Sequence, residues 1–220
     1  MSDFSSWGPT SDLKIKPEIT AHGGEIYSAV PGQAYDRLSG TSMAAPNLAG
    51  AAALIRQYVK KNENNRFGLD GLSGTEKDVK VTALVNQLMM STADIVYNKN
   101  GLPYAVRKQG AGLINIQSSV TTASYITTYE NGTAMDKSKL ELGDDKAKSG
   151  VYTATFDITN ISSSAVAYDV SHIIQTEGVS ATYTSHGETV VTQEGYLLSG
   201  SQISVTSGTG GGTGSGARVT

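Results

Sequence analysis

The hydrophobic residues of this 220-residue chain follow different patterns in its two parts. Up to about residue 123, short apolar pieces and two longer apolar segments alternate with glycine-containing turns; beyond it, apolar and polar positions alternate with period two. Helical spacing indicates helices, and period-two alternation indicates half-buried strands. The pattern therefore predicts a mixed helix and strand domain over residues 1–123 and an all-β domain over residues 124–220.

Two helices are predicted in the first part. Residues 42–60 are rich in Ala, Leu and Ile and apolar nearly all round, which is typical of a buried helix. Thr41 is a suitable N-cap, and Pro46 falls near the first turn, where its missing N–H costs little. Residues 76–93 carry apolar side chains near helical spacing and predict a second helix. Residues 26–30 form a short apolar run between turn residues, which favours a buried strand.

The second part reads as strands. Residues 151–158 and 166–174 alternate with period two, and residues 160–164 supply a turn between them. Further β-like runs are 180–183, 189–192 and 202–206. This pattern predicts an antiparallel sandwich of the immunoglobulin or fibronectin kind. Because a glycine-rich run follows over residues 207–216, the sandwich is either complete or cut short before its last strand.

Composition narrows the classes of function. With 17 Lys and Arg against 20 Asp and Glu, the net charge is −3, which gives no electrostatic footprint for nucleic acid. The absence of cysteine excludes a disulfide framework and a thiol nucleophile. No stretch reaches the roughly 18 to 20 apolar residues that cross a bilayer. Residues 1–30 lack the order of a signal peptide, so the chain is either cytosolic or read from inside a longer protein.

The segment of residues 39–46, SGTSMAAP, carries the clearest chemistry. Ser42 falls in the first turn of the predicted helix, beside unpaired backbone N–H groups and the positive end of the helix dipole. Acyl transfer needs such donors for the developing oxyanion close to a nucleophile. Gly40 permits close approach of another backbone, and Ala44 and Ala45 leave room around the hydroxyl. A serine at a helix start is more often a simple cap, and these residues alone leave that alternative open.

Three segments carry a family resemblance. GTSMAAPNLAGAAAL, residues 40–54, resembles the nucleophile motif of the subtilases, the subtilisin-like serine peptidases: G-T-S-x-A-x-P followed by a small-residue helix. Residues 5–32 are similar to the subtilase stretch from an S-x-x-G-P turn through K-P-D-I-x-A-P-G. GAGLINIQSSV, residues 110–120, resembles the segment that closes the domain and enters a short helix. The resemblance covers about residues 4–123 and implies the C-terminal part of a subtilisin-like three-layer α/β domain.

What this resemblance implies is a Ser-His-Asp peptidase in which Ser42 is acylated and its backbone N–H belongs to the oxyanion hole. In the subtilase order Asp and His precede the serine, and the family's H-G-T-H motif does not occur here, so both are expected upstream of residue 1. His22 is expected in a surface turn, His172 in a core or sheet edge, and His186 in a loop. The chain alone is therefore predicted to be nearly inactive, because an unassisted serine hydroxyl is a weak nucleophile.

Residues 140–160 look like the start of the fibronectin type III-like domain that follows the catalytic domain in lactocepin-type cell-envelope proteinases, with a generic β-sandwich spacer as the alternative. The resemblance implies a fragment of a secreted or cell-envelope serine endopeptidase, extracellular or in a bacterial cell wall, that acts on protein or peptide substrates. A non-catalytic binding or spacer module of a cell-surface protein is the competing hypothesis.

Two further expectations concern partners. No cofactor is evident in the residues; calcium is common in the family and stays open for the longer protein. Because the catalytic part lacks its first strands, it should expose apolar surface and pair with another copy or with the missing segment.

Overall fold

The computed structural model describes residues 1–198, 207–209 and 216–219. Its helices are α1 (Thr41–Lys61), α2 (Gly74–Ser91), α3 (Val106–Gln109) and α4 (Ile116–Thr121). Its strands are β1 (Ile26–Val30), β2 (Ala34–Leu38), β3 (Ser124–Glu130), β4 (Thr133–Ala134), β5 (Phe156–Asn160), β6 (Gln175–Ser185), β7 (Glu188–Leu197), β8 (Ser207–Thr209) and β9 (Gly216–Val219). Among the described helices, none combines the length and the apolar character needed to cross a membrane.

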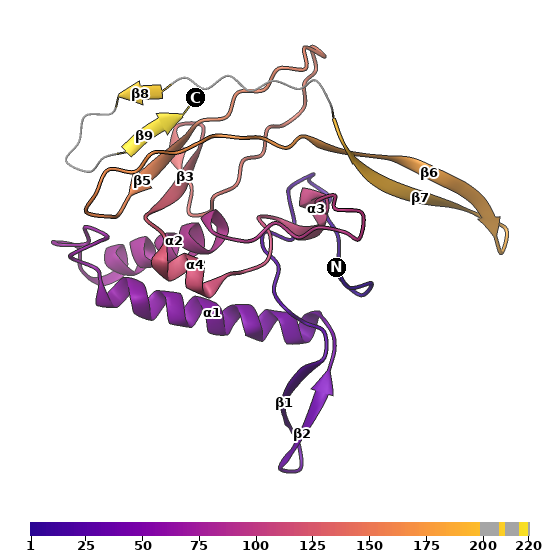
Figure 1. Cartoon of the computed structure of the whole chain (residues 1–220), viewed down its shortest axis with the longest axis horizontal. Coiled ribbons are helices and arrows are strands. Elements are labelled where there is room, and N and C mark those ends of the chain that lie inside the picture. Colours follow the sequence, from indigo (N-terminus) through magenta and orange to yellow (C-terminus); the bar gives the residue numbers. More distant parts are fainter. Residues whose placement is uncertain (199–206, 210–215, 220) are drawn as a thin grey trace.

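The core lies between α1, α2 and the first strands of the second part. Ile55 and Val59 are one helical turn apart on α1 and are fully buried. On α2, four buried aliphatic residues follow a spacing of three and four, which places them on one face: Val81, Leu84, Val85 and Leu88. Near the end of the helix, Gln87, Met89 and Met90 are buried as well. The two helices predicted from residues 42–60 and 76–93 are thus confirmed, with bounds that differ by one or two residues. These two helices, with α4 beside them, form the helical layer of a partial α/β domain (Figure 1).

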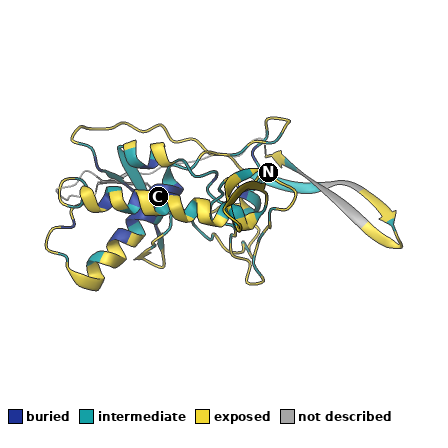
Figure 2. Cartoon of the chain, turned by 90° about the horizontal axis from the view of Figure 1, so that it is seen from below, coloured by how far each residue is buried: buried dark blue, intermediate teal, exposed yellow. Residues whose placement is uncertain are grey.

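Helix α1 is not buried all round, contrary to the sequence prediction. Only Ala51, Ile55 and Val59 are buried, whereas Leu54 is 54% exposed. Exposed surface runs along the helix in Figure 2. The physical reason is that α2 and α4 are the described elements with extensive contact to α1, and they cover one face and leave the opposite face exposed. The N-cap also differs from the prediction, because Gly40 occupies that position and Thr41 is already helical.

Strand β1 forms where it was predicted, but it is not buried. It pairs with β2 in an antiparallel hairpin that stands away from the helices at the start of α1 (Figure 1). The rings of Tyr27 and Tyr35 stack with centroids 5.6 Å apart, and the Arg37 guanidinium lies 5.7 Å from the Tyr27 centroid. A short apolar run between turns does not reveal whether a strand lies inside or on the surface, which is why the burial prediction is wrong.

The second part begins with strands that cover the helices. The five-stranded antiparallel sheet has the order β4-β3-β5-β9-β8, and β3 lies against α2. The Ile126 N–H donates to the Ser91 hydroxyl over 2.9 Å, and Ile161 and Tyr125 pack into the core between the helices. The boundary near residue 123 falls between α4 and β3, and the division into two domains there stays a prediction.

The other strand predictions have mixed outcomes. The run at 151–158 forms a strand only at its end, in β5, and residues 160–164 turn as predicted, with the Ser162 N–H donating to the Asn160 side chain over 2.8 Å. Residues 166–174 are exposed and form no strand; Ile174, at the end of this run, accepts from the Leu198 N–H over 2.9 Å just before β6 begins. The runs at 180–183 and 189–192 lie in β6 and β7, which form a separate hairpin.

The run at 202–206 lies outside the described residues. The strands in the described ranges form one sheet and two hairpins rather than two sheets packed face to face. The immunoglobulin or fibronectin-like sandwich therefore stays a prediction.

An ionic cluster ties the start of the chain to the segment after β4. Glu18 accepts from Lys137 at 2.8 Å, Lys16 at 3.0 Å and Lys139 at 3.1 Å. Partial burial raises the pKa of Glu18, but the three ammonium groups outweigh burial and lower its pKa to about 2. Because Lys137 and Lys139 belong to the second part of the chain, ionised Glu18 holds the two parts together.

Acid should weaken this connection. The pKa of Glu18 is lower in the folded chain than in the unfolded chain, so its stabilisation is complete above pH 4.5 and is lost as the pH falls toward 2. We expect Glu18→Gln to lower the free energy of unfolding by about 1 to 3 kcal/mol at pH 7 and to have little effect near pH 2. Urea unfolding at both pH values measures this difference.

The matched control is Asp12→Asn, because Asp12 pairs with Lys14 at 3.3 Å on the surface, where each side chain is more than half exposed. That substitution should leave the free energy of unfolding nearly unchanged at pH 7, because an exposed ion pair contributes little to stability. An equal loss for both variants, or a Glu18→Gln effect that persists undiminished at pH 2, would contradict the assignment.

Candidate active site

Ser42 is the second residue of α1, with an exposed side chain. The preceding Gly40 has φ 155° and ψ 167°, a conformation that is essentially restricted to glycine. The N–H groups of Met43 and Ala44 donate to the Gly40 carbonyl at 3.1 and 3.3 Å. Within the described part of the chain, the N–H groups of Thr41 and Ser42 have no acceptor. The hydroxyl of Ser42 and two available backbone donors therefore lie together at the positive end of a long helix.

The beginning of this helix packs directly against Gly23. It is buried, and its carbonyl accepts from the Gly40 N–H over 2.8 Å. A Cβ on Gly23 would lie 2.6 Å from the Gly40 oxygen and 3.0 Å from the Ala44 Cβ. The sequence analysis assigned close backbone approach to Gly40, but a Cβ there would meet nothing nearer than the Met43 sulfur at 3.7 Å. Gly40 is needed for its dihedral angles, and Gly23 is the residue that permits the close approach.

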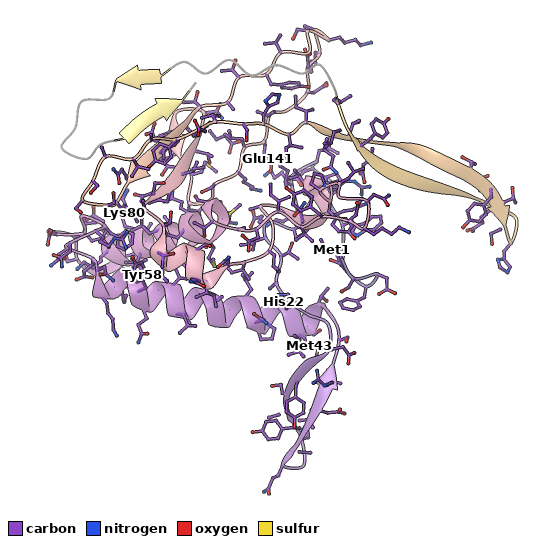
Figure 3. All side chains as sticks on the ribbon, in the orientation of Figure 1. Met1, His22, Met43, Tyr58, Lys80 and Glu141 are labelled. Atoms are coloured by element: carbon purple, nitrogen blue, oxygen red, sulfur yellow. The ribbon has the colours of Figure 1, made fainter. Side chains whose placement is uncertain are left out.

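Side chains at the base of the β1–β2 hairpin add a second connection. The Ser39 hydroxyl accepts from the Glu25 N–H at 2.8 Å and donates to the Glu25 carboxylate at 3.1 Å. The Arg37 guanidinium donates to the Glu25 carbonyl at 3.2 Å. Figure 3 shows His22 and Met43 at this junction, where the hairpin meets the first turn of α1. The sequence analysis did not single out Ser39 or Glu25, because their pairing depends on the hairpin register.

The glycine segment at residues 110–114 packs against the other side of the segment that contains Gly23. Thr20 lies in a parallel bridge with Leu113, and its N–H donates to the Gly112 carbonyl over 2.8 Å. Gly112 leaves no space for a Cβ, which would overlap the carbonyl of Asp94. The predicted close packing of this segment, and the short helix after it, are confirmed. The three sequence motifs thus meet at one place, with the Gly23 segment between the closing segment and α1.

None of the histidines occupies the place of a general base. His22 is exposed on the surface, as predicted, in an irregular segment directly before Gly23 rather than in a turn, and His186 lies in the β6–β7 turn with φ 51°, as predicted. His172 is exposed in an irregular segment, so its expected place in a core or sheet edge is wrong. Among the described residues, no histidine or carboxylate hydrogen-bonds to Ser42, and no group of three or more His, Asp or Glu side chains could hold a metal ion.

Comparisons with known proteins assign the family. The family model Peptidase_S8, described as the subtilase family, matches residues 1–112. The PII-type proteinase of Lacticaseibacillus paracasei is 33% identical over 220 aligned residues, which cover 94% of this chain and 11% of that proteinase. The C5a peptidase of Streptococcus pyogenes is 33% identical over 132 residues, 60% of this chain and 10% of the peptidase.

A solved structure, that of the Clostridium perfringens CspB protease, is 28% identical, with a TM-score of 0.39 over 54% of this chain and 23% of that one. The family match and the spaced motifs show that this chain belongs to the subtilase family. It spans about a tenth of the length of the curated relatives that it matches.

The close contact between Gly23 and the start of α1 can be tested by adding one methyl group. Gly23→Ala forces a Cβ against the Gly40 carbonyl and should destabilise the chain by about 1 to 3 kcal/mol, because backbone must move to accommodate it. The matched control is Gly24→Ala, where a Cβ would have nothing within 4 Å. That change should be neutral or stabilise the chain by up to about 1 kcal/mol through the unfolded state. Urea unfolding of both variants measures the difference, and equal midpoints would contradict the close contact between Gly23 and the start of α1.

Proposed function

We propose that this chain is the C-terminal part of the catalytic domain of a subtilisin-like serine endopeptidase, and that Ser42 is its nucleophile. The observation that carries the proposal is the position of Ser42 in α1. Its exposed hydroxyl stands at the helix start beside the available N–H groups of Thr41 and Ser42, in a chain of the subtilase family. The close contact with Gly23 holds this end of α1 in place.

The arrangement fits acyl transfer. The Ser42 Oγ attacks the carbonyl carbon of the scissile peptide bond, and a histidine takes the Oγ proton and gives it to the departing amine. The carbonyl oxygen becomes an oxyanion, which the Ser42 N–H stabilises together with the positive end of the α1 dipole. Water then attacks the ester carbonyl on Ser42 while the histidine takes a proton from it, and the histidine passes that proton to Oγ as the acid product leaves.

The histidine, the aspartate that orients it and a further oxyanion donor belong, in this proposal, to residues that precede residue 1 in a longer protein. This follows the order of the family, in which the serine comes last. The longer protein would be extracellular or in a bacterial cell wall, acting on proteins or peptides, as the resemblance to lactocepin-type proteinases implies.

The second part of the chain would be a fibronectin type III-like β-sandwich in the same proposal. Its alternating sequence and its position after the subtilase segment support this assignment. We also propose that the exposed apolar side of α1, which includes Leu54, pairs with the preceding part of the catalytic domain or with a second copy of the chain.

Fluorophosphonate labelling tests the nucleophile. The 220-residue chain should label no faster than its Ser42→Ala variant, because no general base activates the hydroxyl. The longer protein with its preceding residues should label on Ser42, at least about a thousandfold faster than its own Ser42→Ala variant. Peptide mapping by mass spectrometry locates the label. The matched control is Ser28→Ala, a serine exposed on β1, which should leave the rate unchanged.

Two results would contradict the proposal. Labelling of the isolated 220-residue chain at the rate of an intact serine peptidase would disprove its inactivity. A longer protein that is folded yet labels no faster than Ser42→Ala would favour a non-catalytic binding or spacer module instead.

A further inference from the structure

The hydrogen bonds at the base of the β1–β2 hairpin lie three residues before the proposed nucleophile. Ser39 makes two bonds to Glu25, one to the backbone N–H and one to the carboxylate, and these lie at 2.8 and 3.1 Å. Only Gly40 and Thr41 separate Ser39 from Ser42. Because that stretch of backbone is so short, holding Ser39 in place limits the positions that Ser42 can take.

The backbone between Ser39 and Ser42 is flexible at Gly40. Gly40 has no Cβ and can change its dihedral angles at little steric cost, so its own conformation does not fix the direction in which α1 begins. Two contacts restrain it from outside: the Gly40 N–H bond to the Gly23 carbonyl and the Ser39 bonds to Glu25. Both end on residues 23–25, which continue from Thr20, whose backbone is hydrogen-bonded to Gly112 and Ile114.

Glu25 is itself held in an unusual conformation. Its φ is 53°, in the left-handed region that residues with side chains rarely adopt. Three bonds hold this residue: its N–H and carboxylate bind Ser39, and its carbonyl accepts from Arg37 at 3.2 Å. In this conformation the backbone N–H and the carboxylate of one residue both face one hydroxyl, which makes the connection directional.

We infer that Ser39 and Glu25 are positioning residues for catalysis: they form a clamp that sets the direction of the Ser42 hydroxyl and N–H toward the substrate. The inference rests on the proposed function of Ser42. An oxyanion donor must lie within about 2.7 to 3.1 Å of the oxygen it stabilises, and a displacement of about 1 Å can cost on the order of a hundredfold in rate. Since Ser39 and Glu25 are exposed, their bonds add little to the stability of the fold.

The clamp therefore predicts a specific pattern in the longer protein that includes the preceding residues. Ser39→Ala should lower kcat by about tenfold, within the range that misplacement produces, and should change KM by less than about twofold. The midpoint of thermal unfolding should shift by no more than about 2 °C, because the lost bonds are exposed. Active-site titration normalises each kcat to the concentration of folded sites.

Conservative variants separate the clamp from general damage. Ser39→Thr keeps a hydroxyl, and Glu25→Gln keeps both the N–H and a side-chain oxygen, so each should restore kcat to within about threefold of wild type. The double variant Ser39→Ala with Glu25→Ala should lose no more than the worse single variant, because both remove the same connection. Ser28→Ala makes the same chemical change on β1 of the same hairpin and should leave kcat unchanged.

The outcomes distinguish failure of the clamp from failure of the proposed function. An active longer protein whose Ser39→Ala variant keeps the wild-type kcat overturns the clamp and leaves the proposed function intact. A rise in KM with unchanged kcat also overturns it, since that pattern belongs to a residue that contacts substrate. A folded longer protein that is no more active than its Ser42→Ala variant overturns the proposed function and the clamp with it.

Discussion

The hydrogen bond from the Gly40 N–H to the Gly23 carbonyl is the constraint on which the site depends. It brings two backbones so close that position 23 has no room for a side chain. On one side of this contact, the Gly23 segment lies against residues 110–114, which in turn lie against Asp94 after α2. On the other side, α1 begins, and Ser42 occupies its first turn. The position of Ser42, the proposed nucleophile, therefore depends on backbone contacts that reach into the helical core, and the Ser39–Glu25 bonds restrain it further.

That core has a distinctive division of roles. The C-terminal half of α1 carries Ile55 and Val59 into the contact with α2, while its N-terminal half is mostly exposed. The helix is thus anchored at its C-terminal end, and the proposed nucleophile lies at its other end. Strand β3 and Ile161 close the core from the second part of the chain, and Glu18 reinforces that contact with its lysine partners. The rigidity that a preorganised site requires comes from these packed elements.

The sequence predicted the helices well because an apolar period close to 3.6 extends over many residues, as in Val81, Leu84 and Leu88. It predicted the place of Ser42 because the motif and the helix start coincide. It wrongly predicted that β1 is buried and that residues 166–174 form a strand, because burial and pairing both depend on which segment lies beside a strand. The need for glycine at 23 and the Ser39–Glu25 pair were not evident for the same reason: each is defined by a contact between residues far apart in the chain. The glycine pair at 23 and 24 was the available signal for the first of these.

The central claim is that Ser42 forms the acyl-enzyme, and trapping that intermediate tests it most directly. The longer protein would be mixed with a peptide ester whose acyl group deacylates slowly, quenched in acid during turnover, digested and examined by mass spectrometry. The account predicts the mass of the acyl group on the peptide that contains Ser42 and its absence in Ser42→Ala. An active enzyme that carries the acyl group on another residue, or on none, would contradict the account.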